Sequence, residues 1–289
     1  MPPQRPNDYA QIRRTAITAL FSDDVLTEYL VLKGGNALDL VYGITSRTSL
    51  DLDFSMNRDF EDFSDARDRL FASLRDRFDA IGCVIFDERL GPRPILMGAD
   101  EKPWWGGYEL SFKLIERQKY QQFKGRLDKL RINALVIGGG EKRSFKIELS
   151  KCEYTDGKVE HEIDHFKVYV YTPSMIAIEK LRAICQQMPE YSHTGNKRAR
   201  ARDFYDIYKV VTACVVDLGT EANSVLIRHI FSAKQVPLAL LENIAQQREF
   251  HRPDWAAVVE ATKGPLHGFD FYFDFVVSEV DRLKSSGMV

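Results

Sequence analysis

Two aspartates separated by a single residue are the side chains of this sequence best suited to chemistry on phosphates. Asp51 and Asp53 lie in an alternating segment, residues 50–55, which predicts a strand with both carboxylates on one face. Adjacent carboxylates repel each other unless a cation lies between them, and Mg²⁺ prefers hard oxygen ligands that it shares with substrate phosphates. A solvated strand face has the same spacing, so the pair alone does not define a metal site.

A glycine pair upstream of the aspartates adds a second feature. Gly34 and Gly35 follow a short apolar run, residues 29–32, and precede a segment with helical spacing, residues 36–42. Glycines at such a turn let backbone amides approach a ligand closely, and the start of a helix adds N–H groups that suit phosphate. A Gly-Gly pair alone is typical of an ordinary turn. The order strand, Gly-Gly, helix, loop and Asp-x-Asp strand is a far more specific indication of a nucleotide site.

The elements that must position these residues fall into two parts. Helical spacing at residues 9–21 and 61–80 predicts helices, and the second of these should cover a sheet. Strand patterns occur at residues 29–32, 50–55, 83–86, 108–114, 145–150 and 166–171. Helical patterns follow at residues 174–188, 201–216, 236–247 and 269–284. We therefore predict an α/β (α+β) fold with an α/β domain at residues 1–172 and a helical domain at residues 173–289.

Four segments of the chain resemble a known family. Residues 32–38 (LKGGNAL) and 47–54 (RTSLDLDF) resemble the first motif of AbiEii-type nucleotidyltransferase toxins, type IV toxin–antitoxin proteins of the DNA polymerase β-like superfamily. Residues 173–183 (PSMIAIEKLRA) and 202–208 (RDFYDIY) resemble the family's lysine motif and its R-D-x-x-D motif. The resemblance spans residues 9–215 and implies a mixed-sheet polymerase β-like domain followed by a helical domain.

The resemblance also implies roles for individual residues. Asp51 and Asp53 would hold Mg²⁺, and the same two residues would act in catalysis together with Lys180, Asp203 and Glu148. The superfamily often has Gly-Ser where this chain has two glycines, and Ser49 is a substitute hydroxyl near the triphosphate. The residues implied in nucleotide binding are Gly34, Gly35, Arg47, Ser49, Lys180 and Arg202.

Lys180 and the acidic residues after it have two interpretations each. Lys180 falls in the apolar belt of its helix, where it either extends to solvent or meets a phosphate, and the resemblance favours phosphate. Asp203 borders the apolar stripe of the next helix and Asp206 lies farther toward solvent, so Asp203 is the predicted functional carboxylate and Asp206 the alternative. An aspartate at a helix start is also a common cap. We expect Lys180→Met to fold, because an apolar isostere often replaces a buried ion without loss.

Glu148 is the candidate third carboxylate. The alternation of residues 145–150 places Glu148 on the face opposite Ile147 and Leu149. In the superfamily an acidic residue on a neighbouring strand completes the metal site or activates the attacking hydroxyl, and it is more often Asp than Glu. A surface glutamate with no catalytic role is the alternative.

Composition limits where partners can bind. The 40 Lys and Arg residues nearly cancel the 42 Asp and Glu residues among the 289, which gives a net charge of −2. A nucleic acid would therefore have to bind a local patch, for which the basic run at residues 197–202 is a candidate. The four cysteines form no C-x-x-C pair, and no apolar run suits a membrane span or a secretory signal. We expect reduced cysteines, a cytoplasmic location and no membrane partner.

Residues 161–165 (HEIDH) match the letters of a zinc-protease motif, which requires a helix. The turn-like Asp156-Gly157 before them and the strand pattern after them argue against that function.

The sequence thus predicts a Mg²⁺-dependent nucleotidyltransferase toxin. The family implies transfer of a nucleoside monophosphate from an NTP to an RNA acceptor, with tRNA 3′ ends known for some relatives, and neutralisation by a cognate antitoxin. Transfer to a protein or small-molecule hydroxyl is one alternative, and an inactive nucleotide-binding module that acts through protein contacts is another.

Overall fold

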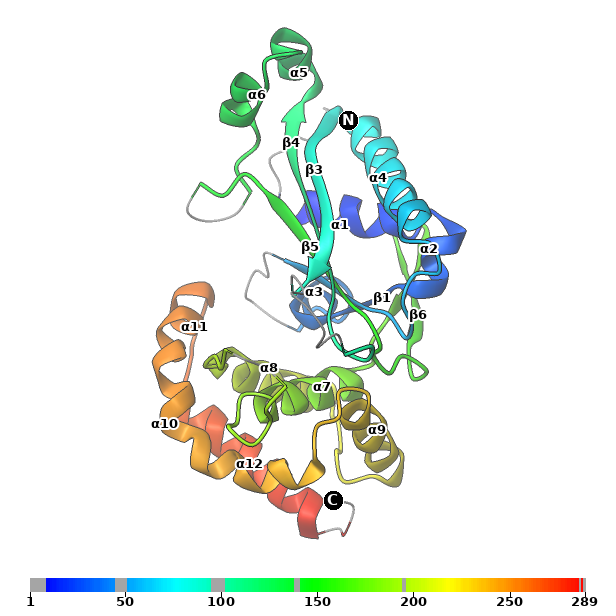
Figure 1. The fold of residues 1–289 in the computed structure, drawn as a ribbon. Helices are drawn as coiled ribbons and strands as arrows, with labels where there is room; N and C mark the ends of the chain where they lie inside the picture. Colours follow the sequence, from blue (N-terminus) through cyan, green and yellow to red (C-terminus); the bar gives the residue numbers. More distant parts are fainter. Residues whose placement is uncertain are drawn as a thin grey trace. The chain divides into compact units, whose positions relative to one another are not determined.

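The computed structural model describes residues 9–44, 51–94, 102–137, 141–193, 196–285 and 287. The chain divides into two compact units (Figure 1). The first contains Met1–Asn36, Ser49–Cys152 and Val159–Val170. The second contains Ala37–Thr48, Glu153–Lys158 and Tyr171–Val289.

The first unit is built on a mixed sheet, as predicted. Its seven described strands have the order β3-β4-β5-β2-β1-β7-β6. The β1–β7 and β2–β5 pairs are parallel and the other pairs are antiparallel. The strands are β1 (Val31–Lys33), β2 (Leu52–Ser55), β3 (Cys83–Arg93), β4 (Gly107–Glu116), β5 (Phe145–Ser150), β6 (Val159–Ile163) and β7 (Phe166–Val170).

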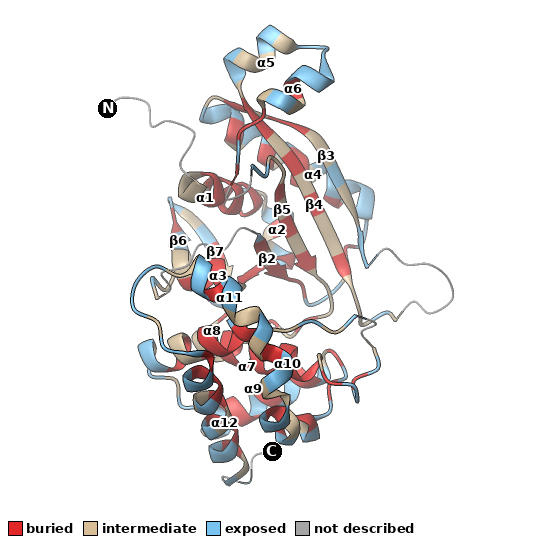
Figure 2. Ribbon diagram, turned by 90° about the vertical axis from the view of Figure 1, so that its left-hand side faces the viewer, coloured by how far each residue is buried: buried red, intermediate tan, exposed pale blue. Residues whose placement is uncertain are grey.

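Alternating burial defines the two faces of this sheet. In β5 every second residue from Phe145 onward is buried, and the residues between them are half-buried. Helices α1 (Tyr9–Leu20) and α4 (Phe63–Ala80) supply apolar side chains to the core (Figure 2), and α2 (Asp24–Tyr29) lies between them in sequence. Asp62 caps α4 by accepting the backbone N–H groups of Ser64 and Asp65. The sheet therefore has one apolar face and one face that is free to carry polar chemistry.

Two short helices extend the first unit beyond β4. Helices α5 (Arg117–Phe123) and α6 (Leu127–Asn133) lie at the end of the long β3–β4 hairpin where β4 finishes (Figure 1). A small cluster of Phe86, Ile115, Leu130 and Ala134 holds them to the strands.

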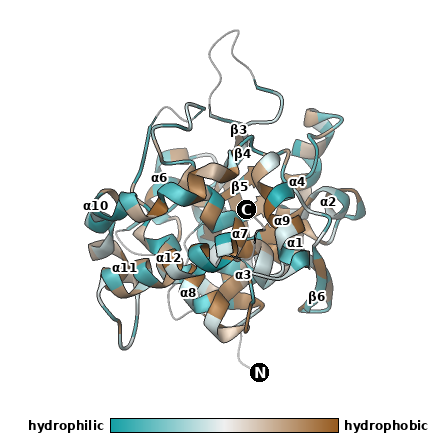
Figure 3. Cartoon of the chain, turned by 90° about the horizontal axis from the view of Figure 1, so that it is seen from below, coloured by the Kyte–Doolittle hydropathy of each residue, from teal (hydrophilic) through white to brown (hydrophobic). Residues whose placement is uncertain are grey.

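The second unit is helical. Helix α3 (Gly34–Leu40) begins in the first unit and ends in the second. The later elements are α7 (Pro173–Cys185), α8 (Ala201–Ala213), α9 (Glu221–Ser232), the 3₁₀ helix η1 (Leu238–Gln247), α10 (Arg248–His251), the 3₁₀ helix η2 (Arg252–Asp254), α11 (Trp255–Ala261) and α12 (Phe269–Ser285). Hydrophilic and hydrophobic segments alternate along these helices, as expected for amphipathic helices (Figure 3). The sequence pattern missed α9, and the helix predicted at residues 236–247 is 3₁₀ rather than α.

Three further sequence features concern the HEIDH segment, the cysteines and candidate membrane spans. The His161–His165 segment forms β6, a turn and the approach to β7, so the helix required by a zinc-protease site is absent there. The four cysteines are free, but only Cys83 and Cys185 are fully buried. Among the described residues, no helix has the length and apolarity to cross a bilayer.

Candidate active site

The glycine turn forms where the sequence predicted it. Strand β1 ends at Lys33 and α3 begins at Gly34, whose φ is +69°. A Cβ atom at Gly34 would lie 2.8 Å from Asp53 Oδ2, which is closer than real Cβ contacts come. Only glycine satisfies both conditions, because other residues rarely adopt this φ. The turn therefore brings bare backbone against the Asp53 carboxylate.

A buried side-chain relay holds the start of β2. Arg13 Nη1 donates to Asn36 Oδ1 at 2.7 Å, and Asn36 Nδ2 donates to the Asp51 carbonyl at 2.6 Å. Arg13 is 4% exposed and Asn36 is completely buried, whereas Asp51 is exposed. This relay ties the backbone of Asp51 to α1 and to the glycine turn. No sequence pattern predicted this relay, although Asn36 directly follows the Gly-Gly pair and is its one sequence signal.

Charged residues form a row across the sheet at Asp53. Lys33 pairs with Asp53 across β1 and β2, Asp53 pairs with Glu148 across β2 and β5, and Glu148 pairs with Glu109 across β5 and β4. Residues paired in this way project from the same face. The row therefore joins two predicted site residues to Lys33 and Glu109, which the sequence analysis did not select.

Lys33 is the buried member of this row. The residue is 7% exposed, and its Nζ donates to Ser150 Oγ at 3.3 Å. Burying an ammonium is costly unless anions or polar groups surround it. Its position directly opposite Asp53 gives the row a fixed positive charge next to a predicted metal ligand.

Glu148 keeps more solvent access than Glu109, the carboxylate paired with it across β4 and β5. Its side chain is 39% exposed and lies 3.8 Å from Arg93. Glu109 takes the closer cationic contacts, with Lys146 at 2.9 Å and with Arg93. The cationic contact of Glu148 is therefore looser than those of Glu109.

The described residues contain no group of three or more His, Cys, Asp or Glu side chains that could hold a metal ion. Asp51, Asp53 and Glu148 are therefore not grouped as a three-carboxylate metal site among the described residues. Mg²⁺ commonly uses one or two protein carboxylates and completes its octahedron with water and substrate phosphates. The Asp51–Asp53 donor set is of that kind.

The second unit contains a buried ion cluster around Lys180. Lys180 Nζ lies 2.8 Å from Asp203 Oδ1 and 2.8 Å from Asp206 Oδ2, and Arg200 Nε donates to Asp203 Oδ2. Lys180 is 6%, Asp203 4% and Asp206 0% exposed. Burial alone would raise the pKa of Asp203, but Arg200 and Lys180 outweigh it and hold that pKa well below its ordinary value.

This cluster corrects two predictions. Asp206, which was placed toward solvent, is completely buried because it turns inward to Lys180. Lys180→Met is no longer expected to be neutral for folding, since the lysine is shared by two buried carboxylates.

His251 contacts the ion cluster through the backbone of Arg200. Its Nδ1 accepts the backbone N–H of Arg200 at 3.0 Å, and its ring lies against Phe204 with centroids 5.1 Å apart. Burial lowers the pKa of His251 to about 4, so the imidazole is neutral near pH 7. The neutral ring thus orients the backbone of Arg200, whose side chain contacts Asp203. No periodicity or motif in the sequence pointed to it.

A separate ion cluster lies on another side of α7. Arg182, 2% exposed, contacts Glu153 Oε2 at 2.6 Å and donates to the Ile230 carbonyl at 3.2 Å, while Lys234 Nζ lies 3.7 Å from Glu153. All its partners are structural side chains or backbone, and we assign this cluster to the fold.

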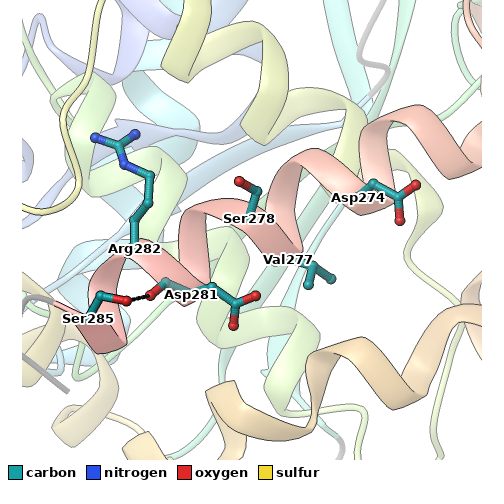
Figure 4. A pocket seen from close by; sticks show the side chains of 6 residues that line it. All are labelled: Asp274, Val277, Ser278, Asp281, Arg282 and Ser285. Carbon is teal, nitrogen blue, oxygen red and sulfur yellow. Dashed lines mark hydrogen bonds between the residues drawn. The ribbon is translucent and has the colours of Figure 1, made fainter.

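The other predicted site residues are placed as follows. Gly35 is buried in the first turn of α3, and Arg202 is exposed at the start of α8. Arg47 and Ser49 lie outside the described residues. Figure 4 shows a shallow pocket on the outer side of α12, lined by Asp274, Val277, Ser278, Asp281, Arg282 and Ser285. It contains none of the predicted site residues.

Comparisons with known proteins were made for the whole chain. Residues 15–275 match the family model described as "Nucleotidyl transferase AbiEii toxin, Type IV TA system". No curated protein matches the chain.

Three solved structures are similar to it, each at 16% identity. A candidate nucleotidyltransferase from H. pylori has a TM-score of 0.47, with 97% of this chain and 95% of that chain covered. JHP933 from Helicobacter pylori has a TM-score of 0.44, with 97% and 92% covered. An antigenic nucleotidyltransferase-like protein from Paracoccidioides brasiliensis has a TM-score of 0.42, with 90% and 95% covered.

Proposed function

Since the chain belongs to the AbiEii family of nucleotidyltransferase toxins of type IV toxin–antitoxin systems, we propose that it transfers a nucleoside monophosphate from an NTP to an RNA acceptor. The nucleotidyltransferase activity and the toxin class follow from the family. We further propose that the reaction uses Mg²⁺, that the acceptor is RNA, and that the reacting group is a tRNA 3′ end. A cognate antitoxin is the partner that the family implies.

The observation that carries the proposal is the close approach of Gly34 to Asp53. A side chain at Gly34 would meet the Asp53 carboxylate, so the glycine lets the backbone of this turn lie directly beside Asp53. Asp51 directly precedes β2, and the Asn36 side chain holds its backbone carbonyl. We assign Asp51 and Asp53 to Mg²⁺, and Gly34 and Gly35 to the phosphates.

Each side chain then has a role in the transfer. When bound, Mg²⁺ would neutralise triphosphate charge and polarise the α-phosphorus. We assign Lys33 and Lys180 to stabilise the negative charge that develops as pyrophosphate leaves. Arg47, Ser49 and Arg202 are assigned to nucleotide binding on the family resemblance.

Glu148 suits proton abstraction better than Asp203 does. A general base works best when its pKa lies near the operating pH and its oxygens are accessible. Asp203 is buried, its two oxygens contact Lys180 and Arg200, and its pKa is lowered. We therefore assign Glu148 as the base that takes the proton of the acceptor hydroxyl, and Asp203 as the residue that positions Lys180.

The proposal is tested by incubating the protein with each labelled NTP, Mg²⁺ and total cellular RNA. We expect label in RNA, lost in Asp51→Asn/Asp53→Asn and retained in the control Asp68→Asn/Asp76→Asn, which removes two exposed carboxylates from α4. Calorimetry with a nonhydrolysable NTP should show the same contrast in binding. Equal binding of the magnesium nucleotide by both double variants would place the site elsewhere.

The acceptor and the toxin role need separate readouts. Label in protein or in small molecules instead of RNA would favour the alternative acceptors. Expression should arrest bacterial growth, and co-expression of a neighbouring antitoxin gene should relieve the arrest. Arrest that persists in Asp51→Asn/Asp53→Asn would favour an inactive module that acts through protein contacts.

A further inference from the structure

The α5–α6 module, residues 117–137, concentrates positive charge in a nearly neutral protein. It contains six Lys or Arg residues against one Asp, a net charge of +5 within 21 residues, while the whole chain carries −2. No residue of α5 is buried, and Leu130 is the one buried residue of α6. Most of this charge is therefore displayed to solvent, where it raises the local concentration of anions.

Part of this charge is used by the fold and part is not. Arg117 pairs with Asp79, Lys119 with Glu116, and Arg131 with Asp87. Lys124 and Lys129 are exposed, and neither has an ion pair within the described residues. Arg126 is also exposed, with its guanidinium over the Phe123 ring at 5.4 Å. Lys124 and Arg126 in the connection between the two helices and Lys129 in α6 thus form an exposed cationic surface.

The position of this surface relative to the carboxylate row indicates the size of its ligand. Glu109 belongs to the row, and β4 continues from it for seven residues to Glu116, where α5 follows. At roughly 3.4 Å per residue, the module begins about 24 Å from the row along the strand. That distance is several times the length of one nucleotide. A nucleotide or small acceptor cannot span it, whereas an RNA chain can.

We propose that the α5–α6 module binds the phosphate backbone of the RNA acceptor, upstream of the end that reacts. This inference rests on the proposed function for the identity of the polymer. It assigns Lys124 and Lys129 to phosphate contacts that give affinity without sequence preference. Exposed Leu127 and Ile132 on α6 are the competing feature, because apolar side chains would favour a protein partner.

Binding is measured by fluorescence anisotropy of the full chain with a labelled single-stranded RNA of about 25 nucleotides, without NTP, at several salt concentrations. Each lost contact should reduce the slope of log K against log salt by about 0.7. Lys124→Gln/Lys129→Gln should therefore lower the slope by about 1.4 and weaken binding about 25-fold at 0.1 M salt. The control Arg67→Gln/Lys263→Gln removes two exposed cations elsewhere and should match the wild type. Melting curves check that all variants fold.

An unchanged salt slope in Lys124→Gln/Lys129→Gln would overturn the proposal. So would loss of RNA binding in Leu127→Ser/Ile132→Ser with full binding in the lysine variant, because RNA binding would then depend on the apolar side chains and not on the lysines. Transfer assays separate this result from the proposed function. Transfer to an RNA of about three nucleotides should be equal in the wild type and the lysine variant, since so short an acceptor does not reach the module. If RNA binds with the expected slope but never receives label, the proposed function fails and the module's role stands.

Discussion

Replacing Lys180 by Met separates a role in the fold from a role in the reaction. The ammonium lies 2.8 Å from an oxygen of Asp203 and 2.8 Å from an oxygen of Asp206, and all three residues are at most 6% exposed. At an effective dielectric constant of about 20, each contact corresponds to about 6 kcal/mol of Coulomb attraction, much of which desolvation offsets. Because the variant takes this cation from two buried carboxylates, we expect the free energy of unfolding to fall by about 3–5 kcal/mol.

A double-mutant cycle tests this magnitude. Asp206→Asn removes one buried charge and keeps the shape, so Lys180→Met/Asp206→Asn leaves a neutral amide where Lys180→Met leaves a carboxylate. A neutral amide at position 206 loses less than a buried carboxylate does when the cation is removed. We expect the double variant to be more stable than Lys180→Met by at least about 1 kcal/mol in chemical denaturation. Equal stability of the two would contradict the charge argument.

The same preparations report on the reaction. Loss of one electrostatic stabiliser typically lowers the rate by about a hundredfold or more, so nucleotide transfer should collapse in both Lys180 variants. The double variant should regain stability but still lack nucleotide-transfer activity. A double variant that is stable and fully active would show that Lys180 serves the fold alone.

Two further perturbations act on the turn and on His251. Gly34→Ala places a methyl group 2.8 Å from Asp53 Oδ2 at a φ of +69°, so calorimetry should show loss of magnesium-nucleotide binding while the sheet still folds; unimpaired binding would disconnect the turn from the site. The folded-state pKa of His251 is about 4 against an ordinary 6.5, so the unfolded chain binds the extra proton first as pH falls from 6.5 to 4, and wild-type stability should drop by up to about 3 kcal/mol across that window. His251→Gln should lose this dependence in denaturation measured between pH 5 and 6.5, and an unchanged profile would assign it to other groups.

The parts of the site that the sequence predicted are those encoded by local patterns. The alternation of residues 50–55 and the Gly-Gly pair after an apolar run are properties of neighbouring residues, and β1, α3 and β2 form where those patterns lie. The lysine and R-D-x-x-D motifs lie on α7 and α8 for the same reason. Thr172 caps α7 through the Met175 N–H, as an N-terminal threonine before proline predicts.

The parts that it missed depend on contacts distant in sequence. Lys33 joins the row through the antiparallel register of β1 and β2, and Glu109 joins it through β5. Strand register across a sheet is not encoded in any one segment. The sequence prediction placed Asp206 toward solvent because a helical wheel shows only its position relative to the apolar stripe of its own helix. Lys180 on the preceding helix supplies a buried partner for Asp206.

The charges of the Lys180 cluster limit what that lysine can do for a nucleotide. Lys180 and Arg200 carry two positive charges, and Asp203 and Asp206 carry two negative charges, so these four side chains are neutral together. A neutral buried cluster orients a lysine but does not by itself attract a triphosphate from solution. Long-range attraction must come from cations that remain exposed, and in the basic run Arg198 and Arg202 are exposed while Lys197 is turned to the carbonyls of Gln186 and Tyr191. If Lys180 acts on phosphates as proposed, it does so only after they arrive, and we therefore expect its loss to lower kcat more than it raises the KM for NTP.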